Sequence, residues 1–307
     1  MKTSMNEQEL QALQGAIERL RAALQEQYEF LLFEPEVRPG PDGPELHGQV
    51  LTARQHQQAL EALREVYPGP VLDRLHVLES DAQGRPLFHY PAPGAPLDVW
   101  SSPRLEKLAT QVLPGDPPFA LLLEMEERAL IRAADGSLGW IERLALERCL
   151  PAETQPEFAP LPCPASPEQE ERVRLGVWAF GLEHLEAPYR LGGRDLQRGL
   201  DCSALAQHAY AHSSAPVLPH PILLPKHSLD QMKAGLRVAP EEAAQGDLIF
   251  LRHAVKKYSH VAIFSGPQEG LVVHASREAG GVVTEPVEAL LARYRLLGFR
   301  TYFQGEK

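Results

Sequence analysis

Cys202 is the residue of this sequence that is best placed to act as a nucleophile. It stands at the start of a helix that the apolar pattern predicts over residues 202–212. Asp201 is expected to cap this helix, so Cys202 lies at the positive end of the helix dipole, where the thiolate is favoured over the thiol. A buried core cysteine is the alternative, because Cys202 shares one side of the helix with Ala206 and Ala209. The helix alone does not distinguish the two.

Two histidines can complete a catalytic group with this cysteine. His260 begins an apolar strand predicted over residues 260–266, and His274 lies in a second strand over residues 271–276. If these strands are antiparallel neighbours, both imidazoles rise on one sheet face, against which the Cys202 helix can pack. A thiolate would then attack an amide carbonyl, His260 would hold and donate the proton, and His274 would orient His260. Backbone N–H groups at the helix start, including that of Cys202, are expected to stabilise the oxyanion.

The same three side chains are also potential zinc ligands. Structural zinc sites usually show closely paired cysteines and histidines, and this spacing is absent from the sequence. The three cysteines, Cys149, Cys163 and Cys202, form no CxxC pair, and an odd number fits no closed set of disulfides. We therefore expect reduced thiols, with no metal and no cofactor.

Composition restricts the partners of the chain. Lys and Arg number 30 against 41 Asp and Glu, which gives a formal net charge of −11. Nucleic-acid binding needs a basic face, so we expect no nucleic-acid partner. The first residues lack the apolar run of a secretory signal, and no stretch is long and apolar enough to span a membrane. A cytoplasmic location is expected, with the cell envelope as the alternative for a chain whose signal has been removed.

The first 82 residues predict a separate module. Residues 1–82 show the order helix, strand, strand, helix, strand, in which Asn6 with Glu9, and Thr52 with Gln55, are expected to cap the two helices. This order resembles the small BON modules of bacterial envelope proteins. The resemblance implies an α/β module with a binding or spacer role.

Residues 90–150 predict a small β-barrel, because short strand-like runs alternate with turn residues. Asp135–Ile141 resembles the end of bacterial SH3-like domains, in which a Gly-Trp-hydrophobic strand enters the core. Trp140 is therefore interpreted as a core residue, whereas Trp100 is a candidate to face a groove. The strands are expected over residues 97–100, 109–113, 119–126, 129–133 and 140–142.

A proline-rich stretch, residues 151–167, predicts a semi-rigid linker to a last domain, residues 168–304. That domain is expected to begin with a helix capped by Ser166 and Gln169. The apolar residues of this helix are interpreted as its buried side: Leu175, Trp178, Leu182 and Leu185.

Five separated segments of the last domain carry motifs in register. They are Pro188–Gly193, Gly199–Ser203, Gly246–Phe250, His260–Gly266 and Val273–Ala275. Together they resemble the NlpC family of papain-like cell-wall cysteine peptidases, over residues 170–303. The resemblance implies an α+β chain with a papain-like catalytic domain and hydrolysis of amide bonds in peptidoglycan-derived peptides. It assigns Cys202, His260 and His274 to the catalytic triad.

The resemblance also implies roles for residues around the triad. Tyr189 matches the tyrosine that lines the site near the oxyanion. Asp201 and Ser203 match positions that hold the substrate's amino end in members that cut after D-glutamate. Two residues depart from the family pattern, because Ala204 replaces a glycine and His227 replaces a threonine. Neither departure removes a catalytic group, so both bear on substrate fit.

An SH3-like segment ahead of such a domain resembles the members that cleave γ-D-glutamyl to L-diamino acid bonds in short muropeptides. In those members the accessory domain narrows the cleft, so that a free N-terminal L-Ala is required. Without a signal, this implies recycling of cell-wall peptides inside the cell. The alternatives are a wall-remodelling hydrolase, an amidase or acyltransferase on another substrate, and a non-catalytic peptidoglycan-binding protein. The sequence indicates neither the diamino acid nor the oligomeric state.

Overall fold

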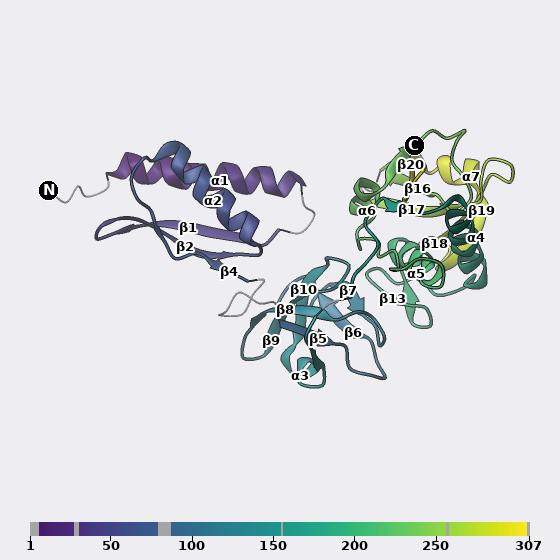
Figure 1. Cartoon of the computed structure of the whole chain (residues 1–307), viewed down its shortest axis with the longest axis horizontal. Helices are drawn as coiled ribbons and strands as arrows, with labels where there is room; N and C mark the ends of the chain where they lie inside the picture. The colour runs from purple at the N-terminus through teal and green to yellow at the C-terminus, as the bar shows by residue number, and fades with distance from the viewer. Residues whose placement is uncertain (1–5, 28–30, 79–86, 155, 256–257, 306–307) are drawn as a thin grey trace.

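The computed structural model describes residues 6–27, 31–78, 87–154, 156–255 and 258–305. Three larger sheets follow one another along the chain, each with its own hydrophobic core (Figure 1). We call the corresponding parts the N-terminal unit (6–78), the β-domain (87–152) and the C-terminal domain (163–305). The predicted end of the first module, residue 82, lies outside the described residues. Among the helices in the described ranges, none is long and apolar enough to cross a membrane.

The N-terminal unit is a four-stranded sheet with two helices packed on it (Figure 1). Reciprocal hydrogen bonds of Asn6 with Glu9, and of Thr52 with Gln55, confirm the predicted helix starts. The predicted last strand is divided into two short pieces that both pair in parallel with β2. The elements are α1 (Glu7–Gln27), β1 (Phe33–Gly40), β2 (Gly43–Val50), α2 (Ala53–Val66), β3 (Leu72–Asp73) and β4 (His76–Val77).

The β-domain is a seven-stranded antiparallel sheet in the order β11-β5-β8-β9-β10-β6-β7. Strands occur at all five predicted places, and β5 and β11 add two that were not predicted. Trp140 stands opposite Trp100 in the register, and both side chains are only partly buried. Trp140 therefore packs at the margin of a core cluster rather than inside it. The elements are β5 (Leu87–Tyr90), β6 (Leu97–Trp100), β7 (Leu108–Val112), β8 (Phe119–Glu124), β9 (Arg128–Arg132), β10 (Leu138–Glu142), α3 (Arg143–Leu146) and β11 (Leu150–Ala152).

The C-terminal domain has a six-stranded sheet in the order β15-β20-β16-β17-β18-β19. Helices α4 and α5 pack against each other and against one face of the sheet, and α7 buries Leu290 in a second, smaller cluster formed by the alternate residues of the same strands. Strands β17 and β18 are antiparallel neighbours, as predicted. The helices are α4 (Pro167–Glu183), α5 (Cys202–Ser214), α6 (Ser228–Ala234) and α7 (Val287–Leu291). The sheet strands are β15 (Leu236–Val238), β16 (Leu248–His253), β17 (Ser259–Phe264), β18 (Leu271–Ser276), β19 (Gly281–Pro286) and β20 (Tyr294–Thr301).

The predicted linker takes part in sheets at both of its ends. Its first residues belong to β11, which pairs with β5 of the β-domain. Near its other end, β12 (Cys163–Pro164) pairs in parallel with β21 (Phe303–Gln304). The segment is therefore attached to both domains that it joins. One further small ladder, β13 (Arg194–Asp195) with β14 (Gly199–Leu200), precedes α5.

The buried side of α4 differs from the prediction. Its start at Ser166 and Gln169 is confirmed, but Leu175, Leu182 and Leu185 are exposed. Of the four predicted core residues, only Trp178 is buried. The helix carries two apolar stripes. The buried stripe lies on the side of the two glycines, because a glycine lets the helix backbone approach the rest of the domain closely. A Cβ at Gly181 would come within 2.9 Å of Val273, and one at Gly176 within 2.9 Å of Ser213. The buried stripe is Val173, Val177, Trp178, Phe180 and Gly181.

Candidate active site

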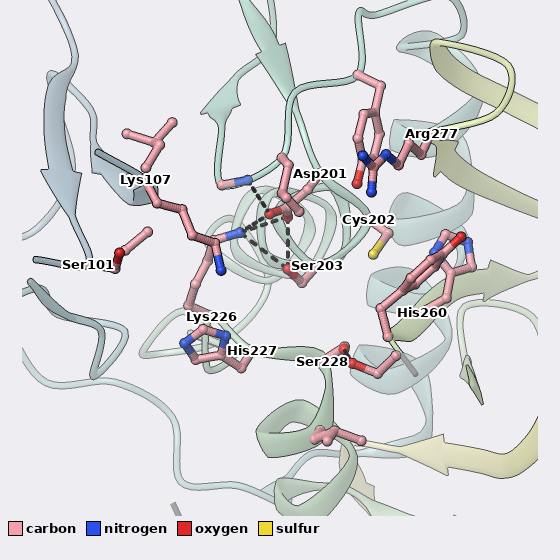
Figure 2. A pocket seen from close by; sticks show the side chains of 18 of the residues that line it. Ser101, Lys107, Asp201, Cys202, Ser203, Lys226, His227, Ser228, His260 and Arg277 are labelled. Carbon is pink, nitrogen blue, oxygen red and sulfur yellow. Dashed lines mark hydrogen bonds and ion pairs between the residues drawn. The ribbon is translucent and has the colours of Figure 1, made fainter. Parts of the chain in front are cut away.

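Cys202 is the first residue of α5, and its side chain is partly buried. Asp201 caps the helix as predicted, with its Oδ1 accepting from the Ala204 N–H at 2.9 Å. A hydrogen bond between the Cys202 side chain and the backbone of Val261, the residue after His260, links Cys202 to β17. In Figure 2 the Cys202 sulfur and the His260 side chain lie at the same end of the pocket. The helix start thus brings the predicted nucleophile to the strand of the predicted base.

The two predicted histidines meet in the structure. His260 on β17 is buried, and its Nε2 lies 2.8 Å from Nδ1 of His274 on β18. The two rings are nearly perpendicular, and the His260 ring stacks on Tyr294 with 5.2 Å between ring centroids. The stacking and the hydrogen bond together hold His260 in one orientation. The predicted antiparallel pairing therefore produced the expected histidine pair. The predicted position of the helix is wrong, because α5 packs against Val261 and Val273, whose side chains lie on the opposite face of the sheet from the two histidines.

A glutamate that the sequence analysis did not consider completes this chain of hydrogen bonds. His274 Nε2 lies 2.7 Å from Oε1 of Glu285 on β19, and Arg293 Nη2 lies 2.5 Å from the same oxygen. Burial opposes ionisation of Glu285, but its hydrogen bonds to Arg293 and His274 outweigh burial, so the pKa of Glu285 is lowered. Glu285 is thus a carboxylate that can only accept a hydrogen bond.

The position of each proton along this chain follows from the glutamate. Burial lowers the pKa of both His260 and His274, so each imidazole is neutral and carries one N–H. Glu285 accepts from His274 Nε2–H, which leaves Nδ1 of His274 as an acceptor. His260 must then donate through its Nε2–H, and its Nδ1 is the basic nitrogen. The arrangement presents His260 as a base without any net charge on the pair.

The cysteine differs from the prediction in its ionisation. Burial first, and the Asp201 carboxylate second, raise the pKa of Cys202 to about 12. The helix start was expected to favour the thiolate, but desolvation disfavours the charged form more strongly. In the free protein Cys202 is therefore a thiol. Attack requires that a base remove its proton, and His260 lines the same pocket.

The pocket that holds these groups has a volume of about 510 Å³ and lies between two domains. Cys202, His260 and Tyr189 line it from the C-terminal domain, and so do Asp201 and Ser203. All predicted site residues except His274 thus line one pocket, and His274 lies behind His260. The β-domain contributes Ser101, Lys107, Leu108, Ala109 and Leu138.

Gly192 is a point of close contact between the C-terminal domain and the β-domain. Gly192 has a φ of +77°, and a Cβ at this position would come within 2.6 Å of the Leu108 carbonyl oxygen. Its N–H donates to Asp201 Oδ2 at 3.0 Å. One glycine therefore contacts both the β-domain and the cap of α5, and its positive φ and close approach to Leu108 both disfavour a side chain.

A buried arginine fixes the same two domains. Arg194 forms an ion pair with Asp116, and its Nη1 donates to the Gln111 carbonyl oxygen at 2.9 Å. The Arg194 N–H also donates to the Gln111 side chain at 2.9 Å. On the other side, Gln207 of α5 donates to Asp135 at 2.9 Å. The β-domain is thus held by buried polar bonds that reach α5 itself.

Asp201 is fully engaged by groups of its own chain. Lys226 Nζ lies 2.7 Å from Oδ1 and 2.6 Å from Oδ2 of Asp201, and Ser203 Oγ donates to Oδ1 at 2.8 Å (Figure 2). Burial opposes ionisation of Asp201, yet Lys226 and these hydrogen bonds lower its pKa. Sequence reasoning missed the role of Lys226, which follows the apolar run Ile222–Leu224 and Pro225. A lysine is rarely fully buried unless it is paired, but the run does not indicate its partner.

Tyr189 lies in the pocket in its neutral form. Burial, together with the nearby Cys202 and Asp201, raises the pKa of its phenol well above the ordinary value. The phenol is therefore a hydrogen-bond donor. Its backbone is held by Tyr189 N–H donating to the Gly280 carbonyl oxygen at 2.8 Å. In the described part of the chain, no group of three His, Cys, Asp or Glu side chains could hold a metal ion.

Comparisons with known proteins agree with this geometry. The sequence profile of the NlpC/P60 family matches residues 186–301. Peptidoglycan endopeptidase RipB of Mycobacterium tuberculosis is 29% identical over 201 residues, covering 60% of this chain and 78% of RipB. Gamma-DL-glutamyl hydrolase of Bacillus subtilis is 30% identical over 96 residues, covering 31% of this chain and 21% of that protein.

Among solved structures, an NlpC/P60 family protein from Bacillus cereus is 23% identical with a TM-score of 0.37, covering 71% of this chain and 64% of that one. The matched range, residues 186–301, contains Cys202, His260 and His274 as well as Glu285. Residues 186–301 of this chain therefore form a domain of the NlpC/P60 family.

Proposed function

We propose that this chain is a cysteine endopeptidase that hydrolyses the γ-D-glutamyl to L-diamino acid bond of peptidoglycan-derived peptides. The observation that carries the proposal is the 2.8 Å contact of His260 Nε2 with His274 Nδ1, in a pocket that Cys202 also lines. Cys202 is the nucleophile, His260 the general base and acid, and His274 the residue that orients His260. The names of the family members RipB and gamma-DL-glutamyl hydrolase support the substrate class.

The reaction starts from the neutral pair. As Cys202 Sγ attacks the amide carbonyl, its proton passes to His260 Nδ1, and the new S–C bond gives a tetrahedral oxyanion. The Cys202 N–H and the Tyr189 phenol are the proposed donors to that oxyanion. His260 then gives the proton to the leaving amine as the C–N bond breaks. A water attacks the thioester, His260 takes its proton, and the S–C bond breaks to restore the Cys202 thiol.

The proposal also covers the β-domain and the N-terminal unit. We propose that the β-domain is the SH3-like domain of the family resemblance, because it supplies one wall of the pocket. Domain limits of 1–82, 90–150, 151–167 and 168–304 are part of the same proposal, with a BON-like first module. The chain would act on muropeptides in the cytoplasm, as in recycling, or on the wall in the cell envelope.

The resemblance also predicts that the substrate needs a free N-terminal L-Ala, held by Asp201 and Ser203. However, Lys226 already donates to both oxygens of Asp201, so a substrate ammonium has to compete with one that belongs to the protein. A requirement for a free amine therefore rests on the resemblance alone, and the contacts of Lys226 with Asp201 argue against it.

The test is a mass-spectrometric assay of the purified protein with L-Ala-γ-D-Glu-diaminopimelate and its N-acetylated form. The proposal expects cleavage after D-Glu by the wild type and none by Cys202→Ala. A control, Cys163→Ala, changes a buried cysteine that does not line the pocket and is expected to retain activity. Equal cleavage by Cys202→Ala, or no cleavage of either peptide, would contradict the proposal and favour another amide substrate or a binding role.

A further inference from the structure

The charges around the pocket are not those of a site for an ammonium group. Of the described residues that line the pocket, Asp201 is the only acid. Both of its oxygens are bonded by Lys226, and Ser203, Ala204 and Gly192 donate to the same carboxylate. The Lys226 and Asp201 side chains are 3% and 9% exposed, so this pair is built into the protein. No carboxylate remains for the amino end of a substrate.

Cations surround this neutralised acid. Lys107, Arg252 and Arg277 line the pocket, and none of them has an ion-pair partner among the residues that the structure describes. Figure 2 shows Lys107 on the Asp201 side of the pocket and Arg277 near Cys202. The pocket wall therefore carries uncompensated positive charge at both ends, although the whole chain has a formal net charge of −11. A local excess of positive charge in a protein with a negative net charge favours the binding of negatively charged groups at that place.

We infer that the cleft selects an acidic peptide whose amino end is acylated, and that it disfavours a free N-terminal ammonium. A free ammonium placed near Asp201 would meet Lys226 and Lys107 without a carboxylate to pair with. An amide at the same place carries no charge and can accept a hydrogen bond from Lys107. Carboxylates of the substrate would pair with Arg252 and Arg277. This inference rests on the proposed hydrolysis and names its substrate class.

Lys107 gives the sharpest variant, because it is exposed and belongs to the β-domain wall rather than to a buried network. Lys107→Glu puts a carboxylate where a substrate ammonium would lie. Arg104→Glu is the matched control, since Arg104 is an exposed cation three residues earlier that does not line the pocket. Both variants change the net charge equally, so a general effect of charge on the chain would appear in both.

The experiment compares kcat/KM for N-acetyl-L-Ala-γ-D-Glu-diaminopimelate and for the same peptide with a free amine. For the wild type the acetylated peptide is expected to be preferred by about tenfold or more. Lys107→Glu should reduce this ratio by about tenfold, and Arg104→Glu should leave it unchanged. A wild type that prefers the free amine, or a ratio that Lys107→Glu does not move, would overturn the inference.

Binding separates this inference from the proposed reaction. Calorimetry with Cys202→Ala gives the Kd of each peptide without turnover, and the same preference for the acetylated peptide is expected. If the wild type cleaves neither peptide while binding still favours the acetylated one, the reaction is wrong and the substrate class stands. Equal binding of the two peptides, or binding of neither, would overturn the substrate class itself.

Discussion

His274 Nε2 lies 2.7 Å from Glu285 Oε1, so a carboxylate on β19 determines which nitrogen of His274 carries its proton. The tautomer of His274 in turn determines which nitrogen of His260 carries a proton, through the 2.8 Å hydrogen bond between the two imidazoles. Glu285 does not line the pocket, and it acts through His274, which makes it a positioning residue. Arg293 holds the same carboxylate from the other side.

Replacing Glu285 should therefore lower kcat without changing substrate binding. In Glu285→Ala the acceptor is lost and His274 can adopt the other tautomer, so we expect kcat to fall by about tenfold to a hundredfold with KM nearly unchanged. Glu285→Gln keeps an acceptor oxygen and should restore much of kcat. Steady-state kinetics on both variants measures this, and a loss confined to KM would count against the positioning role.

The pH dependence of kcat/KM should report a base with a lowered pKa. Burial lowers the pKa of His260 well below its usual 6.5, with His274 and Arg293 adding to the effect. His260 is then neutral at and above pH 6.5, and its proton uptake in acid removes the base. The acid limb of the profile is expected below pH 6.5, whereas an acid limb above pH 7 would show that the imidazole is not buried as described.

The thiol should be slow to alkylate. Burial and Asp201 raise the pKa of Cys202 to about 12, so the thiolate fraction of the free protein keeps rising with pH throughout the neutral range. The rate of iodoacetamide modification at Cys202, followed by peptide mass mapping, should increase about tenfold per pH unit between pH 6 and pH 9. A plateau in this interval would instead indicate a thiolate already formed, as the helix start alone predicts.

Gly192 tests whether the β-domain wall is needed for activity. Gly192→Ala combines a strained φ of +77° with a contact of 2.6 Å to the Leu108 carbonyl oxygen. Gly94→Ala is a matched control, with a φ of +95° and no atom within 4 Å of the added Cβ. Both should lose about 1–3 kcal/mol of unfolding free energy from strain, but only Gly192→Ala should raise KM. Equal KM values in the two variants would show that the β-domain wall does not contribute to substrate binding.

The two apolar stripes of α4 should differ in their effect on stability. Val177 is fully buried, so Val177→Ala is expected to reduce the free energy of unfolding by about 2 kcal/mol. Leu175 is 50% exposed, and Leu175→Ala should change it by no more than about 0.5 kcal/mol. Urea unfolding monitored by circular dichroism measures both. Similar losses in the two variants would mean that the predicted stripe is buried after all.

Local sequence signals predicted the start of each principal helix and the strands that carry the histidines. Caps such as Thr52 with Gln55, and Asp201 with Ala204, act over three residues, so sequence spacing is sufficient to place them. Period two in a strand likewise determines which residues share a face. The His260–His274 pair follows from these local rules once two strands pair. The position of Cys202 does not, because α5 packs on the opposite face of the sheet, against Val261 and Val273.

Other features depended on contacts between segments far apart in the chain. Apolar spacing alone allowed either stripe of α4 to be buried, and close packing on Val273 and Ser213 decided between them. The helix start favoured a Cys202 thiolate, and burial reversed that preference. The pairing of Asp201 with Lys226 joins residues 25 positions apart, which no local spacing signals.

The sequence by itself determined the local elements and the pairing of the two histidines, because helix caps and strand period are set by near neighbours. Only the tertiary structure decided the proton positions, the ionisation of Cys202 and the charge of the pocket, since each depends on burial and on partners from other strands or from the β-domain. Glu285 and Lys107 show the difference most clearly. Neither residue has a sequence motif, and each acquires its role from the surface that faces it.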